Sequence, residues 1–308
     1  MTVRFAVLAH DDAEMLRLLC LKLQPFSVWV HLDKSVPMGR YIASANGPMP
    51  SNVVFVSRRY SVNWGGFSVV RAMNSCASAA IQHAEPDDYV VFLSGRCYPI
   101  RPVTELAELL SKSAGQQFVR AYRLDWQTSS WHVDRYARRH WFDLPFPRGT
   151  RKIVKRLTRY TVKKFTTWPP PRPTSLKVVA GSQWMALTAE CARDALSALE
   201  TTEYAVFRNA FAPDEMAIQT FVYNSKWASC VSSGGPEALP GEDISSLPNF
   251  HYLRPALEGL ATEGDFYAAK LSGAFFLRKL DSSSPVLEII DASLKSSTAD
   301  EKGGSSSM

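Results

Sequence analysis

The chain has 308 residues, of which 46% are hydrophobic and 21% are charged, and its formal net charge is +6. This is ordinary globular composition, and the length allows one large α/β domain or two smaller ones. No run of about 18 apolar residues occurs. The N-terminal stretch MTVRFAVLAHDD runs into acids without a small-residue cleavage site, so we expect a soluble protein that is not exported.

The cysteines and histidines show no ligand or disulfide pattern. The five cysteines are odd in number, widely spaced and free of any CxxC pair, so we expect reduced thiols in a cytoplasm. The six histidines do not cluster with acids at metal-ligand spacing. Nothing in the sequence therefore predicts a structural zinc site.

The first half of the chain alternates apolar runs with helical patterns. The predicted elements, in order, are strand 4–10, helix 12–24, strand 27–35, strand 52–57, helix 68–84 and strand 87–95. Near-continuous apolar strands separated by helices indicate a mostly parallel central sheet with helices on both faces. The pattern is that of a nucleotide-binding α/β sheet, whose ligands bind beyond the carboxyl ends of the strands.

A basic segment follows in the second half. Residues 147–164 contain eight Lys or Arg and no acid, and Ile153, Val154, Leu157, Tyr160 and Thr161 recur at helical spacing. This predicts a basic amphipathic helix over about 148–164. Either it is a solvated surface helix that buries one stripe, or it binds an anionic membrane surface or nucleic acid.

The remaining elements are less regular. We expect, in order, a strand-like segment at 118–126, an extended proline-broken loop at 168–177, a strand at 176–188, a helix at 189–200 and a Gly/Ser/Pro-rich loop at 232–248. The low-complexity end is expected to be disordered. The chain is thus predicted as a single domain over 1–290 with a disordered tail over 291–308.

The stretch FAPDEMAIQTF, residues 211–221, places Asp214 and Glu215 directly behind Pro213. One interpretation is helix-start chemistry, because proline suits the first helical position and acids in the first turn favour the positive end of the helix dipole. The other interpretation is a catalytic base. The residues of this stretch alone leave both open.

The strand 87–95 runs into Ser94 and Gly95 and does not end in a carboxylate pair, which a divalent cation would need to hold a diphosphate. If a nucleotide diphosphate binds here without metal, cations of the protein must neutralise it. Arg254, Arg278 and Lys279 are the candidates, with ordinary surface charges as the alternative. Gly95 alternatively serves only a tight turn.

Seven segments resemble one known family. FAVLAHDD, VWVHLDK, NWGGFSVVRA, DDYVVFLSGRCYPI, GSQWMALTAEC, FAPDEMAIQTF and FFLRKLD follow, in order and at the expected separations, the pattern of the core-2/I-branching glycosyltransferases. That family includes β-1,6-N-acetylglucosaminyltransferases, and peptide O-xylosyltransferases are similar. The resemblance covers residues 4 to about 282. It implies a GT-A-like fold, a UDP-sugar donor, inverting transfer without a divalent metal or other cofactor, and Glu215 as the catalytic base.

The same resemblance implies roles for further residues. Lys279, and less closely Arg254, match phosphate-binding positions, and Asp33 matches the position that faces the base and ribose, although a turn or helix cap is an equal alternative. The remaining candidates on the donor side are Trp64, Gly65, Gly66, Ser94, Gly95 and Arg278, and those on the acceptor side are Asp214, Gln183, Trp184 and Tyr252. Trp184 alternatively belongs to the core.

The partners follow from these interpretations. Animal relatives carry a membrane anchor and disulfides, which this sequence lacks, so we expect a cytoplasmic enzyme, with the basic helix able to hold it at the inner membrane face. The acceptor is a glycan, a lipid-linked saccharide or a small molecule. A different class stays open: a non-catalytic protein that binds nucleic acid or an anionic membrane through the basic helix 148–164. A transferase with a polyanionic acceptor would combine the two.

Overall fold

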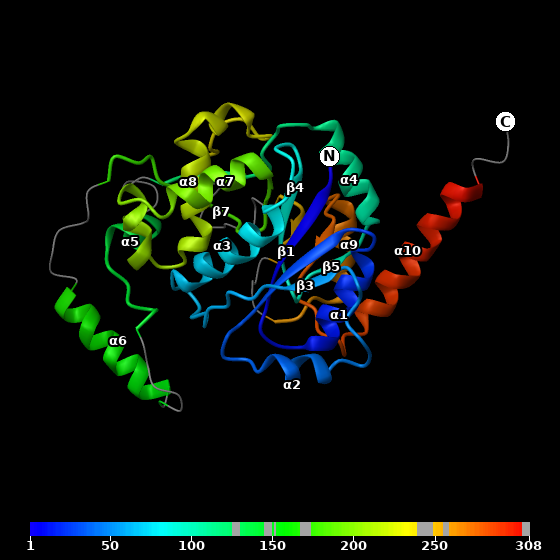
Figure 1. Ribbon diagram of the computed structural model, residues 1–308, viewed down its shortest axis with the longest axis horizontal. Coiled ribbons are helices and arrows are strands. Elements are labelled where there is room, and N and C mark those ends of the chain that lie inside the picture. The colour runs from blue at the N-terminus through cyan, green and yellow to red at the C-terminus, as the bar shows by residue number, and fades with distance from the viewer. Residues whose placement is uncertain are drawn as a thin grey trace.

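The computed structural model describes residues 1–124, 130–144, 150, 152–166, 174–238, 249–254 and 259–303 (Figure 1). The predicted proline-rich loop lies outside these residues over 168–173, and so does the predicted Gly/Ser/Pro-rich loop over 239–248. In chain order the elements are β1 Val3–Ala9, α1 Ala13–Lys22, β2 Ser27–Leu32, α2 Met38–Ala43, β3 Val53–Phe55, α3 Ser68–Ile81, β4 Tyr89–Ser94, β5 Tyr98–Pro99, α4 Val103–Lys112, β6 Ala121–Arg123, α5 Ser130–Ala137, α6 Lys152–Thr166, β7 Val179–Gly181, β8 Ala186–Thr188, α7 Ala189–Ala198, η1 Glu203–Asn209, η2 Pro213–Glu215, α8 Ala217–Tyr223, η3 Lys226–Cys230, β9 His251–Tyr252, α9 Glu263–Leu271, β10 Phe276–Leu277 and α10 Val286–Gly303.

The central sheet has five strands in the order β3-β2-β1-β4-β8. The first four are parallel, and β8 pairs antiparallel with β4 at one edge. The chain moves from β1 outward to β2 and β3, and then returns to the other side of β1 with β4. The order therefore reverses between β1 and β4, and a parallel α/β sheet opens a crevice at the carboxyl ends of the strands at such a point.

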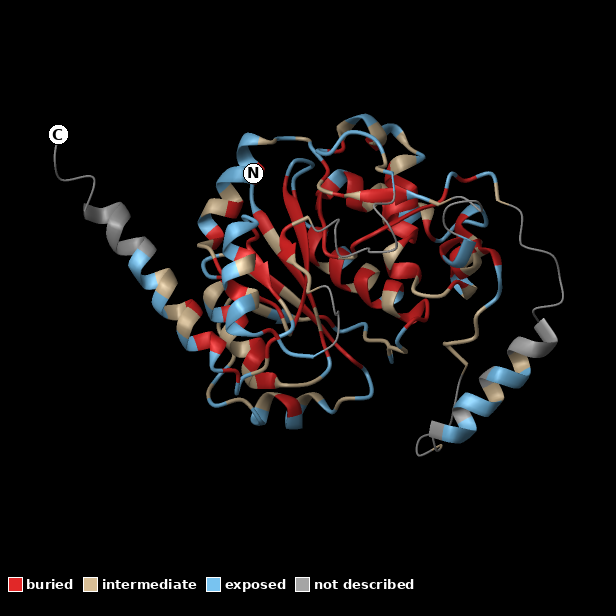
Figure 2. Ribbon diagram, turned by 180° about the vertical axis from the view of Figure 1, so that it is seen from behind, coloured by how far each residue is buried: buried red, intermediate tan, exposed pale blue. Residues whose placement is uncertain are grey.

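Alternate side chains of the central strands enter two different cores. Ala6 of β1 with Val90 and Phe92 of β4 pack under α3, α7 and α8. Their neighbours Phe5 and Val7 pack against α1 and α4 on the other face. Both faces are therefore covered (Figures 1 and 2), and this explains the near-continuous apolar strands. The predicted α/β fold with a mostly parallel sheet between helices is confirmed.

Two smaller sheets extend the central one. β10 pairs antiparallel with β5 and parallel with β9, and β6 pairs antiparallel with β7. The prediction of one strand over 176–188 is wrong, because the chain divides it into β7 and β8, which lie in different sheets. Gly181 ends β7 so close to the backbone of Arg120 that a Cβ would strike its carbonyl. The side-chain amide of Gln219 donates to the carbonyl of Ser182 at 3.0 Å and fixes the following turn.

The C-terminal segment is helical. Residues 291–303 of the predicted disordered tail continue helix α10, which ends at Gly303. Val286, Leu287 and Ile290 pack into a third core with residues of α9. The carboxylate of Asp291 accepts from Tyr98 Oη at 3.0 Å and pairs with Lys22 Nζ at 2.8 Å. Low-complexity residues thus continue a helix that these apolar contacts start. Residues 304–308 lie outside the described part of the chain.

The basic helix is present as α6, and it stands away from the sheets in both views (Figures 1 and 2). The alternative in which it buries one stripe is wrong, because Ile153, Leu157 and Tyr160 are 60–65% exposed. Among the described residues, no helix has both the length and the apolar character to cross a bilayer.

Candidate functional site

Two adjacent cavities open at the carboxyl ends of β1, β2 and β4. The larger, of about 590 Å³, and the smaller, of about 400 Å³, share Leu8, Ala9 and His10 at the end of β1. They also share Ser94 at the end of β4, together with Arg278. Together they form one cleft where the strand order reverses, which is the expected ligand site of this architecture.

Glu215 lies in the larger cavity at the end of η2 and is held there by an arginine. The guanidinium of Arg135, on α5, donates to Glu215 Oε2 at 2.5 Å. The side chain of Arg135 is 2% exposed, whereas that of Glu215 is 29% exposed and open to the cavity. A buried arginine paired with a carboxylate that still faces solvent fixes that carboxylate without removing it from reach.

The same guanidinium also supports the backbone in front of η2. It donates to the carbonyls of Phe211 at 3.3 Å and Ala212 at 3.1 Å. Ala212 has φ 49°, in the left-handed region that a residue with a Cβ rarely adopts, and its N–H donates to the carbonyl of Gly65. Strained backbone held by several contacts is typical of functional sites. Pro213 begins η2, so the helix-start interpretation applies, and the same turn presents the carboxylate of Glu215 to the cavity.

Asp214 also lines the larger cavity, but it is buried. Burial, and then the neighbouring charge of Glu215, raise the pKa of the Asp214 carboxyl to about 7. Near neutral pH this carboxyl therefore exchanges a proton while it sits beside Glu215. Such a pair of acids with different environments is common where proton transfer occurs.

An aromatic group forms one wall of the larger cavity. The ring of Trp64 is 77% exposed and meets the edge of Phe211 at a centroid distance of 5.4 Å. Trp131 of α5 lines the same wall. Gly65 has φ 75°, and a Cβ there would run into the ring of Phe211, so only glycine fits. An exposed tryptophan in a cleft offers a flat apolar face to a ring of a ligand.

Arg278 lies between the cavities, at the end of β10. Its guanidinium carbon is 4.7 Å from the ring centroid of Trp184. Trp184 is buried, as a core residue would be, and it also lines the larger cavity. Burial lowers the pKa of Arg278, while the thiol of Cys97 and the carboxylate of Glu215 act in the opposite direction. Within the described residues its buried Nε has no hydrogen-bond partner. An unsatisfied donor beside a cavity indicates a place for an acceptor group.

A neutral histidine backs this arginine. Burial, and then the charge of Arg278, lower the pKa of His251 well below its ordinary value. Its Nε2 lies 3.3 Å from Cys97 Sγ, and that sulfur lies 3.2 Å from Ser94 Oγ. Because His251 is uncharged, Arg278 is the cation among Arg278, His251, Cys97 and Ser94, and it lines both cavities of the cleft.

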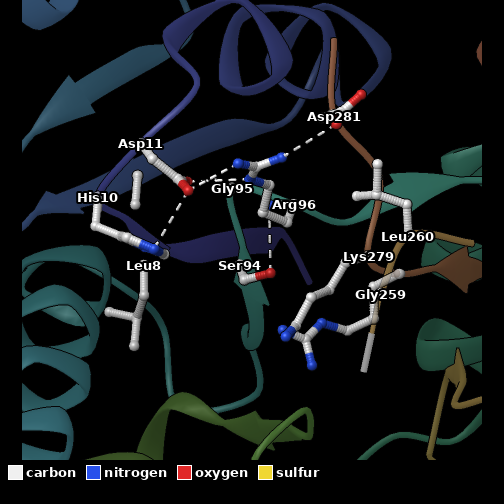
Figure 3. Close-up of a pocket in the computed structure, with 12 residues that line it drawn as sticks. Leu8, His10, Asp11, Ser94, Gly95, Arg96, Gly259, Leu260, Lys279 and Asp281 are labelled. Atoms are coloured by element: carbon white, nitrogen blue, oxygen red, sulfur yellow. Dashed lines mark hydrogen bonds and ion pairs between the residues drawn. The ribbon is translucent and has the colours of Figure 1, made fainter. Parts of the chain in front are cut away.

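The smaller cavity contains a second cation. Figure 3 shows Lys279 pointing into the space between Ser94 and Gly259. Gly95 also lines this cavity, where a Cβ would lie 3.3 Å from that of Ala9. Its small size therefore serves close packing of β4 against the end of β1.

A third cation in this region is already paired. Arg96 donates to Asp11 through Nε at 3.0 Å and through Nη2 at 2.7 Å, and lies 4.0 Å from Asp281 (Figure 3). It also lies 3.5 Å from Asp12. Burial would raise the pKa of Asp11, but hydrogen bonding to Arg96 and the charge of His10 outweigh it and lower that pKa. One guanidinium therefore contacts three carboxylates near the ends of β1 and β10 and offsets part of their charge.

Asp33, directly after β2, lines the larger cavity and also fixes two turns. One of its oxygens accepts from the N–H of Ser35 at 2.7 Å, and the other accepts from the N–H of Val62 at 2.9 Å. The turn-forming role is therefore present. Gln183 lies on the same cavity wall.

Three predicted site residues line neither cavity. A Cβ on Gly66 would strike the carboxylate of Asp143, which caps the start of α3. Arg254 pairs with Asp265 at 3.1 Å and donates to the carbonyl of Leu260 at 2.7 Å. Tyr252 packs on the third core. Their predicted ligand contacts remain predictions, although the structure brings the other eleven together in one cleft.

The sequence interpretation missed Arg135, Trp131, Asp11 and Arg96. The first two lie in the segment WHVDRYARRH, where neither spacing nor a motif distinguishes one arginine from its neighbours. Asp11 lies in the segment FAVLAHDD and Arg96 in the segment DDYVVFLSGRCYPI. Each residue follows the end of a strand, and these two strands, β1 and β4, are neighbours in the sheet. Within the described residues, no group of three or more His, Cys, Asp or Glu could hold a metal ion.

The fold and the cleft define a class: an α/β protein of the nucleotide-binding type. At the carboxyl ends of its parallel strands lie two cations and a carboxylate that an arginine fixes in place. Within this class the chain belongs to the Core-2/I-Branching enzyme family, whose model matches residues 3–234. The resemblance found in the sequence is confirmed.

Curated proteins similar to the chain include xylosyltransferase sqv-6 of Caenorhabditis briggsae, 22% identical over 204 residues, and xylosyltransferase oxt of Drosophila melanogaster, 23% identical over 204 residues. These matches cover 65% and 64% of this chain, but only 23% and 21% of the relatives. The chain thus spans less than a quarter of their length. Among solved structures, the apo structure of the WbbM bifunctional glycosyltransferase matches 92% of this chain and 46% of that chain, with 13% identity and a TM-score of 0.33.

Proposed function

We propose that the protein is an inverting glycosyltransferase that moves a sugar from a UDP-sugar to an acceptor hydroxyl. The observation that carries the proposal is the position of Glu215 in the same cleft as Arg278 and Lys279. Inversion needs one carboxylate to accept a proton on one side of the anomeric carbon, and positive charge for the leaving group on the other. Membership of the Core-2/I-Branching enzyme family supports the same activity.

The proposed reaction uses Glu215 as the general base. It accepts the proton of the acceptor hydroxyl while that oxygen forms a bond to the anomeric carbon and the bond to the diphosphate breaks. Arg135 keeps the Glu215 carboxylate directed into the cavity. Arg278 and Lys279 bind the departing UDP, whose phosphate oxygens would give the unpaired Nε of Arg278 an acceptor.

We propose that no divalent metal takes part. The carboxylates of Asp11, Asp12 and Asp281, beside the smaller cavity, already surround the guanidinium of Arg96, which offsets part of their charge. Arg278 and Lys279 then supply the positive charge that a metal gives in other sugar-nucleotide transferases. Activity should persist in EDTA. Loss of activity on chelation, with rescue by Mn²⁺ or Mg²⁺, would contradict this part of the proposal.

A donor screen tests the proposed activity. Purified protein is incubated with each common UDP-sugar, including UDP-xylose and UDP-N-acetylglucosamine, and the release of UDP is measured with and without simple saccharide acceptors. The relatives named xylosyltransferases and the family's name give these two donors priority. We expect one donor to be turned over. If no UDP-sugar binds and none releases UDP, the proposal is wrong.

A further inference from the structure

Helix α6, Lys152–Thr166, separates its charged and apolar positions. Successive residues of an α-helix are turned by about 100°, which places five of the six cations of α6 within an arc of about 100°. These five are Lys152, Lys155, Arg156, Arg159 and Lys163. The apolar positions 153, 154, 157 and 160 fall outside that arc, and no acid occurs along the helix. The sixth cation, Lys164, falls on the apolar side, near the C-terminal end of the helix.

The apolar side of α6 is uncovered. Ile153 is 65% exposed, Val154 46%, Leu157 60% and Tyr160 65%. None of the three cores includes these side chains. Both views show α6 apart from the folded body (Figures 1 and 2). Because a surface helix normally buries its apolar stripe, four exposed residues on one stripe indicate a partner that covers them.

The charge pattern selects the partner. We propose that α6 docks on the surface of an anionic lipid bilayer. A helix with cations on one side and Ile, Val, Leu and Tyr on the other lies in the interface plane, with its apolar side among the acyl chains and its cations among the headgroups. Duplex nucleic acid would match only the cations and would leave the apolar side chains in water. The bilayer therefore accounts for both sides of the helix.

This inference does not depend on the proposed transfer reaction. Among the side chains of α6 that the structure describes, none lines either cavity of the cleft. Vesicle binding and UDP release can thus be measured separately, and the failure of one leaves the other unaffected.

Co-sedimentation with vesicles tests the docking. The 308-residue chain is mixed at low salt with vesicles of phosphatidylcholine alone or with added phosphatidylglycerol. We expect at least about tenfold stronger binding to the anionic vesicles, and loss of that preference at high salt, where the Debye length falls to about 3 Å. Wild-type protein that ignores anionic vesicles at low salt would overturn the inference.

Two variants separate the contributions of the two sides. The first replaces the apolar side chains by serine, as Ile153→Ser, Leu157→Ser and Tyr160→Ser, and the second reverses Arg156 and Arg159 together with Lys152 and Lys155 to glutamate. Each should weaken binding by about tenfold or more, since both sides contribute. The serine variant should keep the thermal unfolding of the wild type, because the replaced apolar side chains are exposed.

Matched controls use exposed residues elsewhere. Leu271→Ser replaces a 91% exposed leucine of α9, and Arg40→Glu with Lys112→Glu reverses two exposed cations, so these variants should bind vesicles as the wild type does. A serine variant of α6 that binds vesicles as well as wild type would overturn the inference. So would strong binding of wild type and serine variant to duplex DNA without binding to vesicles, which would assign the helix to nucleic acid.

Discussion

Glu215 and Arg135 are 80 residues apart in the sequence and form one ion pair in the cleft. The sequence predicts Glu215 as the base through its resemblance to a family motif, because its neighbours in the chain carry the signal. Arg135 has no such signal. Its role depends on a contact between α5 and η2 that only the fold creates, and the same is true of the pairing of Arg254 with Asp265.

Replacing Arg135 by lysine tests whether it positions Glu215. A lysine keeps the charge but cannot donate at once to Glu215, Phe211 and Ala212, as the guanidinium does. We expect kcat to fall by about tenfold or more, with a smaller change in the KM of the donor. Steady-state kinetics of the folded variant measure both constants.

The matched control is Arg138→Lys, one turn further along the same segment. Arg138 pairs with Asp134 at the surface, where its side chain is 44% exposed, and exposed pairs of this kind contribute little. This control should keep wild-type kinetics. Equal kcat values for Arg135→Lys and Arg138→Lys would show that Arg135 does not position the base.

Asp214 gives the protein a pH-dependent stability. Its pKa is raised to about 7 in the folded state, chiefly by burial, whereas an unfolded aspartate titrates near pH 4. Between these values the folded state retains a proton that the unfolded state has lost. The contribution of Asp214 to stability therefore falls as the pH rises from about 4 to about 7, and stays low above that range.

Asp214→Asn should remove this dependence, since an amide does not titrate. From pH 5 to pH 8, the free energy of unfolding of the variant should rise relative to wild type by on the order of 1 kcal/mol or more. Urea denaturation at both pH values measures it, with the exposed Asp87→Asn as control. A constant difference between variant and wild type at the two pH values would contradict the buried, protonated carboxyl.

At the scale of elements, the sequence predicts those helices and strands whose positions depend on contacts between residues close together in the chain. The helix starting at Ser68 and the strand ending at Ser94 lie where the sequence predicts them, because the apolar spacing within each element and the turns beside it are visible in the local sequence. The strand over 176–188 could not be divided from the sequence, since the close approach of Gly181 to Arg120 is a tertiary contact. The helix α10 was not predicted for the same reason: its sequence is mostly polar, and the few apolar residues that pack it against the third core give no clear local pattern.

Ile290→Ala tests whether α10 belongs to the folded body. The side chain of Ile290 is fully buried in the third core, so its truncation should lower the free energy of unfolding by about 2–5 kcal/mol. Glu288→Ala, an exposed position of the same helix, should change it little. Chemical denaturation compares the two. Equal stability of both variants and wild type would mean that this end of the chain does not pack as described.

At the scale of the whole molecule, the sequence predicts the architecture better than the composition of the site. Alternating apolar strands and helices predict a parallel sheet, and the reversal of strand order between β1 and β4 then fixes where a ligand binds. Eleven of the predicted residues meet there, since they follow strand ends or belong to motifs near them. The antiparallel edge strand β8 and the two small sheets depend on long-range pairing that no local pattern shows.

The central claim is that one carboxylate in this cleft removes the proton of the acceptor. Glu215→Gln preserves the shape of the side chain and removes its basicity. With a UDP-sugar that the wild type turns over, kcat should fall by about 10²-fold or more, while the Kd of the donor and the thermal unfolding stay near wild type. Glu203→Gln, an exposed position of η1, should leave kcat unchanged. A folded Glu215→Gln protein with near wild-type kcat would contradict the account.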